Sequence, residues 1–277
     1  MPDPALSEIA SDPTGFSGDF SEGLVVSLRG VTKRYDSGLI ALGPLDLDVR
    51  QGEFVSLLGP SGCGKSTALR LIAGLNAPTS GTVQVSRRIS ETRAGHSIGF
   101  VFQEPTLMPW ASVRENVRLP LKLAHTPLPE ANARIDQALA QVGLGEFADA
   151  FPRELSGGMK MRVSLARALV TDPDILLMDE PFAALDEITR FRLNNDLLSL
   201  WRDLRKTVIF VTHSVFESVY LSQRVIVMTA RPGRIAAEFR IDAPEPRQED
   251  FRTSVEYAGY CRIVSNALAP LHQGQPV

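Results

Sequence analysis

The sequence contains very little cysteine and no excess of positive charge. Its two cysteines, Cys63 and Cys261, lie far apart and lack the spacing of a zinc site, which disfavours both a disulfide framework and a metal cluster. The formal net charge is -3, so the chain has no general electrostatic attraction to nucleic acid or anionic lipid. We therefore expect no nucleic-acid partner, and phosphate binding must depend on local geometry.

The sequence also lacks a long apolar segment. No apolar run approaches the roughly 20 residues that a membrane-spanning helix needs. No Lys or Arg precedes Arg29, and no apolar stretch near the N-terminus fits a secretion signal. These features favour a protein of the reducing cytoplasm that reaches a membrane only through a membrane-bound partner.

The distribution of apolar residues predicts an α/β fold. Residues 1–23 are rich in Pro, Ser, Gly and acidic residues, and we expect a disordered tail there. Residues 24–28 and 45–49 alternate in the manner of antiparallel strands, whereas later apolar runs are continuous, as in buried parallel strands. These runs cover residues 54–58, 98–102, 175–178 and 208–211, and the helices predicted between them cover residues 65–74, 129–142 and 156–170. The alternation indicates a parallel sheet with crossover helices.

Other segments complete the predicted organisation. Residues from about 104 to 172 contain no convincing strand, and a possible capping box of Ser112 and Glu115 indicates a helical insertion. Residues 225–241 predict a hairpin, and residues 251–268 an amphipathic helix. The predicted domains are a tail, an α/β unit and a C-terminal linker with a helix, at residues 1–23, 24–242 and 243–277.

One glycine-rich loop matches the phosphate-binding pattern G-x-x-x-x-G-K-S. It follows an apolar strand and opens a helix, which is the context that the pattern requires. Its residues are Gly59, Pro60, Ser61, Gly62, Cys63, Gly64, Lys65 and Ser66. In such a loop, backbone N–H groups face phosphate oxygens, the lysine bridges the β- and γ-phosphates, and the serine binds Mg²⁺. A plain glycine turn is the weaker interpretation, because a chance match in a chain of this length has a probability of roughly 1%.

Polar side chains follow three other predicted strands, where they would lie at the same edge of the sheet. Asp179 and Glu180 follow one strand, and one carboxylate can serve a metal ion while the other deprotonates water. Alone, this pair fits an ordinary strand end equally well. His213 follows the next strand and can donate to a γ-phosphate, while Gln103 offers an amide to water or Mg²⁺.

Ser156, Gly157 and Gly158 form a second candidate phosphate cradle. Leu155 precedes them, and Met159 begins a helix-forming run. One small domain rarely needs two separate cradles to hold one nucleotide. The second cradle therefore indicates that another copy of the protein takes part.

Together, these motifs and their order over residues 24–241 resemble the nucleotide-binding subunit of ATP-binding cassette (ABC) transporters. In that family, Tyr35 looks like the aromatic that stacks on adenine, although it also fits an ordinary core aromatic at a strand end. The glycine-rich loop, extended to Thr67, resembles the Walker A loop. Gln103 resembles the Q-loop residue.

The later motifs of the family also have counterparts in the sequence. Residues 155–159 resemble the signature motif, Asp179 and Glu180 the Walker B pair, Asp186 the D-loop acid and His213 the switch histidine. Three residues depart from the commonest family pattern, and none removes a group that phosphoryl transfer needs. They are Met159 in place of Gln, Ala183 in place of Ser and Ser214 in place of Asp.

The resemblance implies a fold, a reaction and a dimer. The implied fold is a P-loop NTPase core with a parallel sheet, an antiparallel β subdomain and a helical insertion. The implied cofactors are ATP and Mg²⁺, with the metal at Ser66, Gln103 and Asp179. Glu180 would act as the base, assisted by His213, Lys65 and Gln103. ATP would lie between the Walker A loop of one subunit and Ser156, Gly157 and Gly158 of a second, head-to-tail copy.

The loop after Gln103 predicts a contact with a transmembrane partner. Leu107, Met108 and Trp110 are costly to expose, and by resemblance this surface receives a helix of the permease. A self-contained apolar loop that packs on the helical insertion is the alternative.

The same loop and residues 229–235 look most like the sequences found in importers of the nitrate, sulfonate and taurine type. An ordinary tight hairpin turn explains residues 231–234 equally well. An importer implies a periplasmic or extracellular solute-binding protein and a peripheral position on the cytoplasmic face of the cell membrane. The alternative functions are a soluble ABC ATPase in DNA repair or translation, which the absence of a heptad run disfavours, and a regulatory module without turnover.

Overall fold

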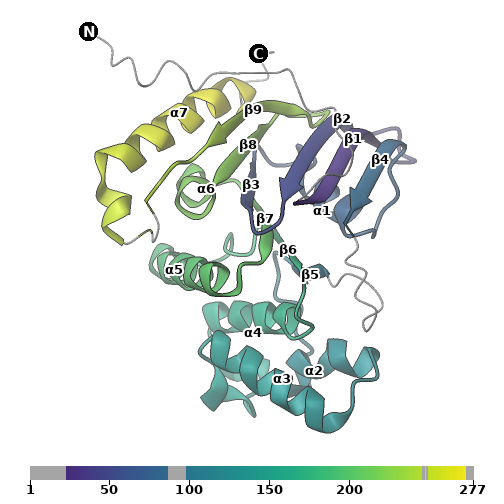
Figure 1. Cartoon of the computed structure of the whole chain (residues 1–277), viewed down its shortest axis with the longest axis vertical. Helices are drawn as coiled ribbons and strands as arrows, with labels where there is room; N and C mark the ends of the chain where they lie inside the picture. Colours follow the sequence, from purple (N-terminus) through teal and green to yellow (C-terminus); the bar gives the residue numbers. More distant parts are fainter. Residues whose placement is uncertain (1–22, 87–97, 245–246, 248, 273–277) are drawn as a thin grey trace.

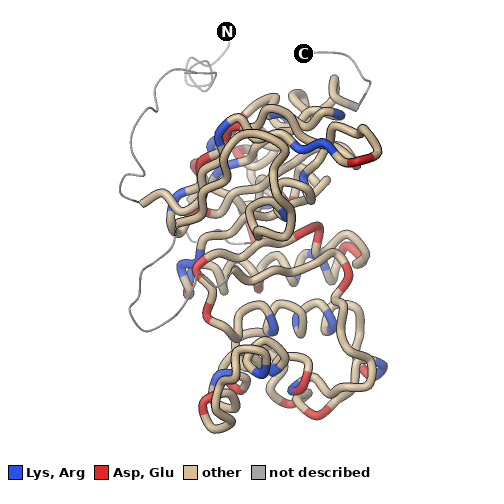
Figure 2. Tube along the Cα trace, turned by 90° about the vertical axis from the view of Figure 1, so that its right-hand side faces the viewer, with Lys and Arg blue, Asp and Glu red and all other residues tan. Residues whose placement is uncertain are grey.

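The computed structural model describes residues 23–86, 98–244, 247 and 249–272. The predicted disordered tail therefore lies outside the described residues, except for Gly23, and so does part of the predicted C-terminal linker. Charged residues of both signs are spread along the described length of the chain trace (Figure 2). No helix within the described ranges is long and apolar enough to cross a membrane.

A six-stranded sheet forms the centre of the fold (Figure 1). Its strand order is β5-β6-β7-β3-β8-β9, in which only β9 runs antiparallel to its neighbour. The strands are β3 (Phe54–Leu58), β5 (Ile98–Val101), β6 (Ile175–Asp179), β7 (Thr207–Thr212), β8 (Arg224–Met228) and β9 (Ile235–Arg240). All residues of β3, β6 and β7 are buried, which explains why their sequences are continuous apolar runs. The predicted parallel strands and the β8–β9 hairpin are thus confirmed.

A separate antiparallel sheet of order β2-β1-β4 packs beside the central sheet. Its strands are β1 (Leu24–Arg34), β2 (Ile40–Arg50) and β4 (Ser80–Val85). Residues 24–28 and 45–49, predicted as antiparallel strands, lie in β1 and β2, which pair with each other and extend further than predicted. The sequence reasoning missed β4, because its side chains are exposed or half-buried and its apolar alternation is limited to Val83 and Val85.

Helices cover both faces of the central sheet. Figure 1 shows α1 (Lys65–Ile72) between the two sheets, and α5 (Glu187–Leu204), α6 (Val215–Leu221) and α7 (Val255–His272) on the other face. Alternate residues of β3 separate two cores: Val55 and Leu57 face α1, while Phe54 and Leu58 face the second group of helices. The Phe54 ring meets the Trp201 ring edge-on at 5.7 Å between centroids. The result is a layered α/β unit, as predicted.

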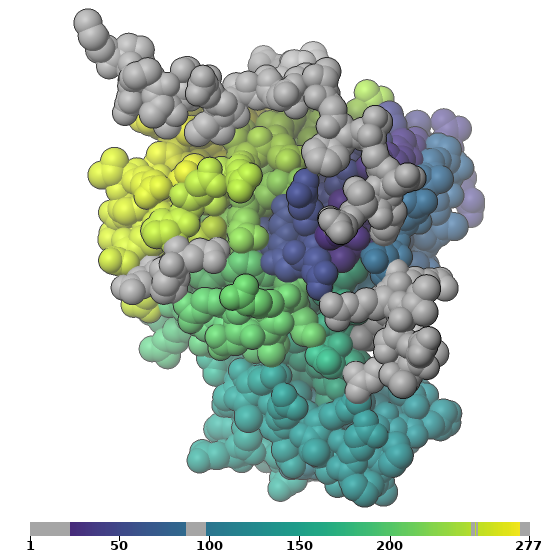
Figure 3. Space-filling model, viewed as in Figure 1, coloured from purple at the N-terminus to yellow at the C-terminus, as the bar shows by residue number. Residues whose placement is uncertain are grey.

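A helical block projects from the β5–β6 end of the sheet (Figures 1 and 3). It contains α2 (Val113–Leu123), α3 (Leu128–Gln141) and α4 (Gly157–Leu169), with short 3-10 turns at Gly145–Phe147 and Pro152–Glu154. The predicted capping box is present: the Ser112 side chain accepts from the Glu115 N–H, and the Glu115 carboxylate accepts from the Ser112 N–H. The exact domain boundaries stay a prediction.

The C-terminal helix differs from its prediction at both ends, since it also ends at His272 rather than at residue 268. A 3-10 turn, Glu249–Thr253, precedes α7, which starts at Val255 rather than at residue 251. Helices α5 and α6 were not predicted. In α5, the buried face includes the polar residue Asn194, which interrupts the apolar periodicity that would indicate a helix. Helix α6 is only 7 residues long and almost wholly buried beyond its first turn.

The three-stranded sheet permits a test of its packing. Gly81 has a φ of 82°, and a Cβ there would lie 2.4 Å from the Gly30 carbonyl oxygen. Gly38 has a similar φ of 84° with nothing within 4 Å of its Cβ position. We predict that Gly38→Ala lowers the free energy of unfolding by about 1 kcal/mol through the backbone conformation alone. Gly81→Ala should lower it by about 1–3 kcal/mol more through overpacking. Urea denaturation of both variants measures the difference, and equal free energies of unfolding would contradict the close approach.

Candidate functional site

The glycine-rich loop lies at the carboxyl end of β3 and leads into α1. Gly62 and Gly64 have φ angles of 75° and 97°, which L side chains rarely adopt. A Cβ on Gly64 would lie 2.6 Å from the Ala41 carbonyl oxygen, and one on Gly59 would lie 2.8 Å from the Met228 carbonyl oxygen. The loop is therefore held between β2 and β8 at positions that only glycine can occupy. Such a turn at a helix N-terminus is suited to bind phosphate.

Lys65 is the most deeply buried charged group of the site. Its side chain is 3% exposed, and its Nζ donates to the carbonyl oxygens of Gly59 at 2.7 Å and Pro60 at 3.1 Å. The same Nζ lies 3.5 Å from the Glu180 Oε1 atom. The ammonium group is thus fixed at the base of the loop, beside the Glu180 carboxylate, which directly follows β6.

Asp179 and Glu180 point to different partners, as expected for adjacent residues at a strand end. The Ser66 Oγ donates to the Asp179 Oδ1 at 2.7 Å, and burial raises the pKa of Asp179. The Glu180 carboxylate instead lies between Lys65 Nζ and His213 Nδ1, which is 3.2 Å from its Oε2. Glu180 also has a φ of 45°, a strained conformation that is concentrated at functional sites.

A pocket of about 400 Å³ opens on the glycine-rich loop. The Tyr35 hydroxyl lies 3.4 Å from Thr67 Oγ1 at one side of it. The lining residues come from the β1–β2 loop, β2, the glycine-rich loop, α1 and the segments that follow β5, β6 and β8: Tyr35, Leu39, Ala41, Ser61, Gly62, Gly64, Lys65, Ser66, Thr67, Gln103, Glu180 and Arg231. The structure therefore brings Tyr35, Gln103 and Glu180 together around the loop. Cys63, in contrast, is buried beneath it, and burial raises the pKa of its thiol.

Two residues near this pocket were missed by the sequence reasoning. Arg231 reaches it from the β8–β9 hairpin, although residues 231–234 were considered only as a turn or a subgroup feature. Glu217 is buried behind His213, where Thr212 Oγ1 donates to its Oε2 at 2.5 Å, and burial raises the pKa of this carboxyl. No sequence signal identified Glu217, because it lies within a short helix that was not predicted.

The second candidate cradle lies elsewhere. Ser156 caps α4 and accepts a hydrogen bond from the Met159 N–H at 3.3 Å. A Cβ on Gly158 would lie 2.7 Å from the Thr189 side chain of α5. Among the described residues, none of those that line the loop pocket comes from residues 155–159. Asp186 caps α5, and its hydrogen bonds with Thr189 lower its pKa.

The loop after Gln103 has apolar side chains both in contact with the core and exposed to solvent. Trp110 is 77% exposed, whereas Leu107 packs against the core, so only part of the loop is available to a partner. Met108 is half-buried, and its N–H donates to the Asn116 Oδ1 at 2.7 Å. Arg167 fixes the loop from α4 through the carbonyl oxygens of residues 105 and 106.

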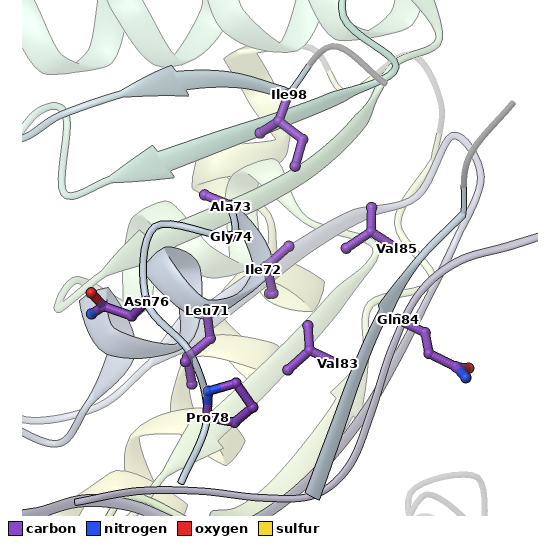
Figure 4. Close-up of a pocket in the computed structure, with 10 residues that line it drawn as sticks. All are labelled: Leu71, Ile72, Ala73, Gly74, Asn76, Pro78, Val83, Gln84, Val85 and Ile98. Carbon is purple, nitrogen blue, oxygen red and sulfur yellow. The ribbon is translucent and has the colours of Figure 1, made fainter. Parts of the chain in front are cut away.

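A larger hollow lies away from these groups. Figure 4 shows it between the end of α1, β4 and the start of β5, with Leu71, Ile72, Val83, Val85 and Ile98 in its lining. Its volume is about 700 Å³, and none of its lining residues carries a charge or belongs to the predicted site. It borders residues outside the described ranges, so we assign it no function.

The sequence is similar to several curated proteins along most of its length. It is 48% identical over 243 residues to a putative ATP-binding protein of Brucella abortus, covering 88% of this chain and 93% of that protein. It is 48% identical over 209 residues to a taurine import ATP-binding protein of Rhizobium johnstonii, covering 76% and 79%. A nitrate import ATP-binding protein of Synechocystis is 47% identical over 237 residues, covering 83% and 88%.

Solved structures share the fold. CbiO1 of Clostridium perfringens, part of an ABC transporter complex, matches with a TM-score of 0.71 at 30% identity, covering 79% of this chain and 89% of that chain. The ATP-binding cassette MJ0796, solved as a dimer with ADP and phosphate, matches with a TM-score of 0.68 at 35% identity, covering 79% and 100%. These likenesses confirm the predicted fold class.

The family model described as ABC transporter matches residues 42–183, which include the glycine-rich loop, the second cradle, Asp179 and Glu180. The resemblance inferred from the motifs is thereby confirmed. The chain belongs to the ABC transporter family, and its named relatives are ATP-binding proteins.

Proposed function

We propose that this chain is the ATP-hydrolysing subunit that energises an ABC importer. One observation carries the proposal: Glu180 lies between the buried Lys65 ammonium and the imidazole of His213, at the mouth of a phosphate-binding loop. A carboxylate so placed can accept a proton from water beside a bound γ-phosphate. The fold and the family provide the context for this chemistry.

The residues around Ser66 suit a magnesium ion. The Ser66 hydroxyl and the Asp179 carboxylate are 2.7 Å apart, and Gln103 lines the same pocket. The described residues contain no group of three His, Cys, Asp or Glu that could bind a metal on their own. One hydroxyl and one carboxylate, from Ser66 and Asp179, suit Mg²⁺, which usually takes only one or two protein ligands together with water and phosphate oxygens. When bound, the ion would neutralise charge on the phosphates.

The protein groups then have separate tasks during hydrolysis. Lys65 would bind β- and γ-phosphate oxygens in place of the carbonyl oxygens of Gly59 and Pro60. Glu180 would orient water and accept its proton, while His213, whose side chain is 51% exposed, would hold the Glu180 carboxylate and face the γ-phosphate. Tyr35, at the other side of the pocket, would contact the adenine base.

A second copy would complete the site. Ser156, Gly157 and Gly158 lie at the N-terminus of α4, outside the pocket of their own subunit, and Ser156 and Gly157 are exposed there whereas Gly158 is buried. In a head-to-tail dimer they would bind the nucleotide held by the partner, which suits the positive end of a helix. The dimeric MJ0796 cassette supports this arrangement by analogy. A monomer would then hydrolyse ATP slowly.

The importer assignment specifies further partners. Trp110 would contact a helix of a transmembrane permease, which would hold the chain at the cytoplasmic face of the cell membrane. A periplasmic or extracellular solute-binding protein would complete the complex. The taurine and nitrate import proteins among the relatives support a transporter of that type, and the solute itself would be selected by the other chains.

The role of Glu180 is tested by Glu180→Gln. Because the variant keeps the shape but loses the base, we predict that ATP turnover falls by a factor on the order of 10²–10⁴, while ATP binding persists and an ATP-bound dimer accumulates. Phosphate release and size-exclusion chromatography with ATP measure the two effects. Glu146→Gln, at an exposed position of the helical block, is the control. A wild-type rate in Glu180→Gln would show that another group is the base.

The docking surface is tested by Trp110→Ala. We predict unchanged ATP binding and roughly tenfold weaker association with the transmembrane partner, because exposed aromatic residues often dominate interfaces. The measurement is the fraction of the chain that co-purifies with the permease from membranes. Leu128→Ala removes another exposed apolar side chain of the helical block and serves as the control, since Leu128 is 54% exposed. Equal co-purification of the Trp110 variant and the wild type would exclude this contact.

A further inference from the structure

The loop between β8 and β9 is packed against the glycine-rich loop. The Gly233 N–H donates to the Ala41 carbonyl oxygen at 3.0 Å, and the Gly43 N–H donates to the Gly233 carbonyl oxygen at 3.1 Å. A Cβ on Gly233 would lie 1.9 Å from the Cys63 carbonyl oxygen. The hairpin loop is therefore fixed directly behind the residues that would hold phosphate, with no room for a side chain between them.

This packing places the Arg231 side chain at the nucleotide pocket. Arg231 lines the pocket together with Lys65 and Glu180. Its Nε lies 3.5 Å from the Gly62 carbonyl oxygen, and its Nη2 lies 2.9 Å from the position that a Cβ on Gly62 would occupy. The guanidinium group thus lies on the Gly62 side of the loop, whereas Lys65 lies on the Gly59 side.

The charge of Arg231 has no counterpart in the described part of the chain. No carboxylate there forms an ion pair with it, and its one protein hydrogen bond, to Gly62, is long. Arg234, from the same loop, differs because its Nε donates to the Gly43 carbonyl oxygen at 2.6 Å and so stabilises the hairpin. A guanidinium has five N–H donors in a planar fork that matches phosphate oxygens. At the mouth of this pocket, those donors are available to an anion.

We propose that Arg231 contacts the nucleotide, with its guanidinium binding the phosphate chain from the Gly62 side of the loop. The inference rests on the proposed function, since it presumes that the pocket holds ATP. Lys65 and Arg231 would then bind the phosphates from two sides, and the β8–β9 hairpin would be part of the nucleotide site. Affinity would depend on a residue that follows the last of the family motifs in the sequence.

The test measures nucleotide affinity in the full chain. We expect Arg231→Met to raise the Kd for ATP and for ADP about tenfold, because a charged hydrogen bond of this kind contributes about one decade of affinity. The Kd for adenosine, which has no phosphate, should not change. Arg231→Lys should recover part of the loss, since it keeps the charge without the fork. The dependence of the ATP Kd on salt should be weaker in Arg231→Met than in the wild type.

Arg240→Met is the matched control. Arg240 lies on β9 of the same hairpin, its side chain is 82% exposed, and its one ion-pair partner among the described residues is nearby Asp242, so its replacement removes one positive charge away from the pocket. We expect its ATP and ADP affinities to equal those of the wild type. Thermal unfolding without nucleotide, followed for all three variants, should give midpoints equal to the wild-type midpoint.

The possible failures are distinguishable. If the wild type does not bind ATP, the proposed function itself is wrong. If the wild type binds ATP and Arg231→Met has the same Kd at every salt concentration, the contact does not exist. Arg231→Met could also weaken adenosine binding as much as ATP binding, or unfold at a lower temperature than the wild type without nucleotide. Either result would show that Arg231 only supports the loop, and this would also overturn the inference.

Discussion

The order of three neighbouring strands is the constraint on which the site depends. The strands β6, β7 and β3 are adjacent and parallel in the sheet although they are far apart in the chain, so their carboxyl ends meet at one edge. That edge brings Glu180 within 3.5 Å of Lys65 and 3.2 Å of His213. Each strand is fully buried, and the apolar runs that hold the sheet together therefore also fix the positions of the polar groups at their ends.

A second constraint is the close packing around the phosphate-binding loop. Ala41 of β2 limits the space at Gly64, Met228 of β8 limits it at Gly59, and Gly233 itself lies against Cys63. Because no side chain fits at these contacts, movement of β2 or of the hairpin would be transmitted directly to the loop. The glycines therefore serve two purposes, since they allow the turn that faces phosphate and the contacts that hold it. Arg231 enters the pocket as a consequence of this packing.

Local sequence patterns predicted the parallel strands well, because continuous burial on both faces leaves an unbroken apolar run. They also predicted the phosphate loop and the placement of polar residues after the strands. They failed for β4, whose side chains are largely exposed, and for α5, whose buried face includes Asn194. The loop after Gln103 was predicted to present Leu107 and Trp110 alike, but Leu107 faces the core and Trp110 faces solvent. Which of two apolar side chains in one loop faces the core depends on packing rather than on residue type.

The sequence by itself determined the strands of the central sheet, the chemical groups of the site and the family, since each rests on residue type and spacing over a few positions. Only the tertiary structure decided which groups meet. It placed Glu180 between Lys65 and His213, separated the segment around Ser156 from the pocket of its own subunit, and brought Arg231 to Gly62. The physical reason is that hydrogen bonds and packing between distant segments leave no local periodicity, so their result is visible only after the chain has folded.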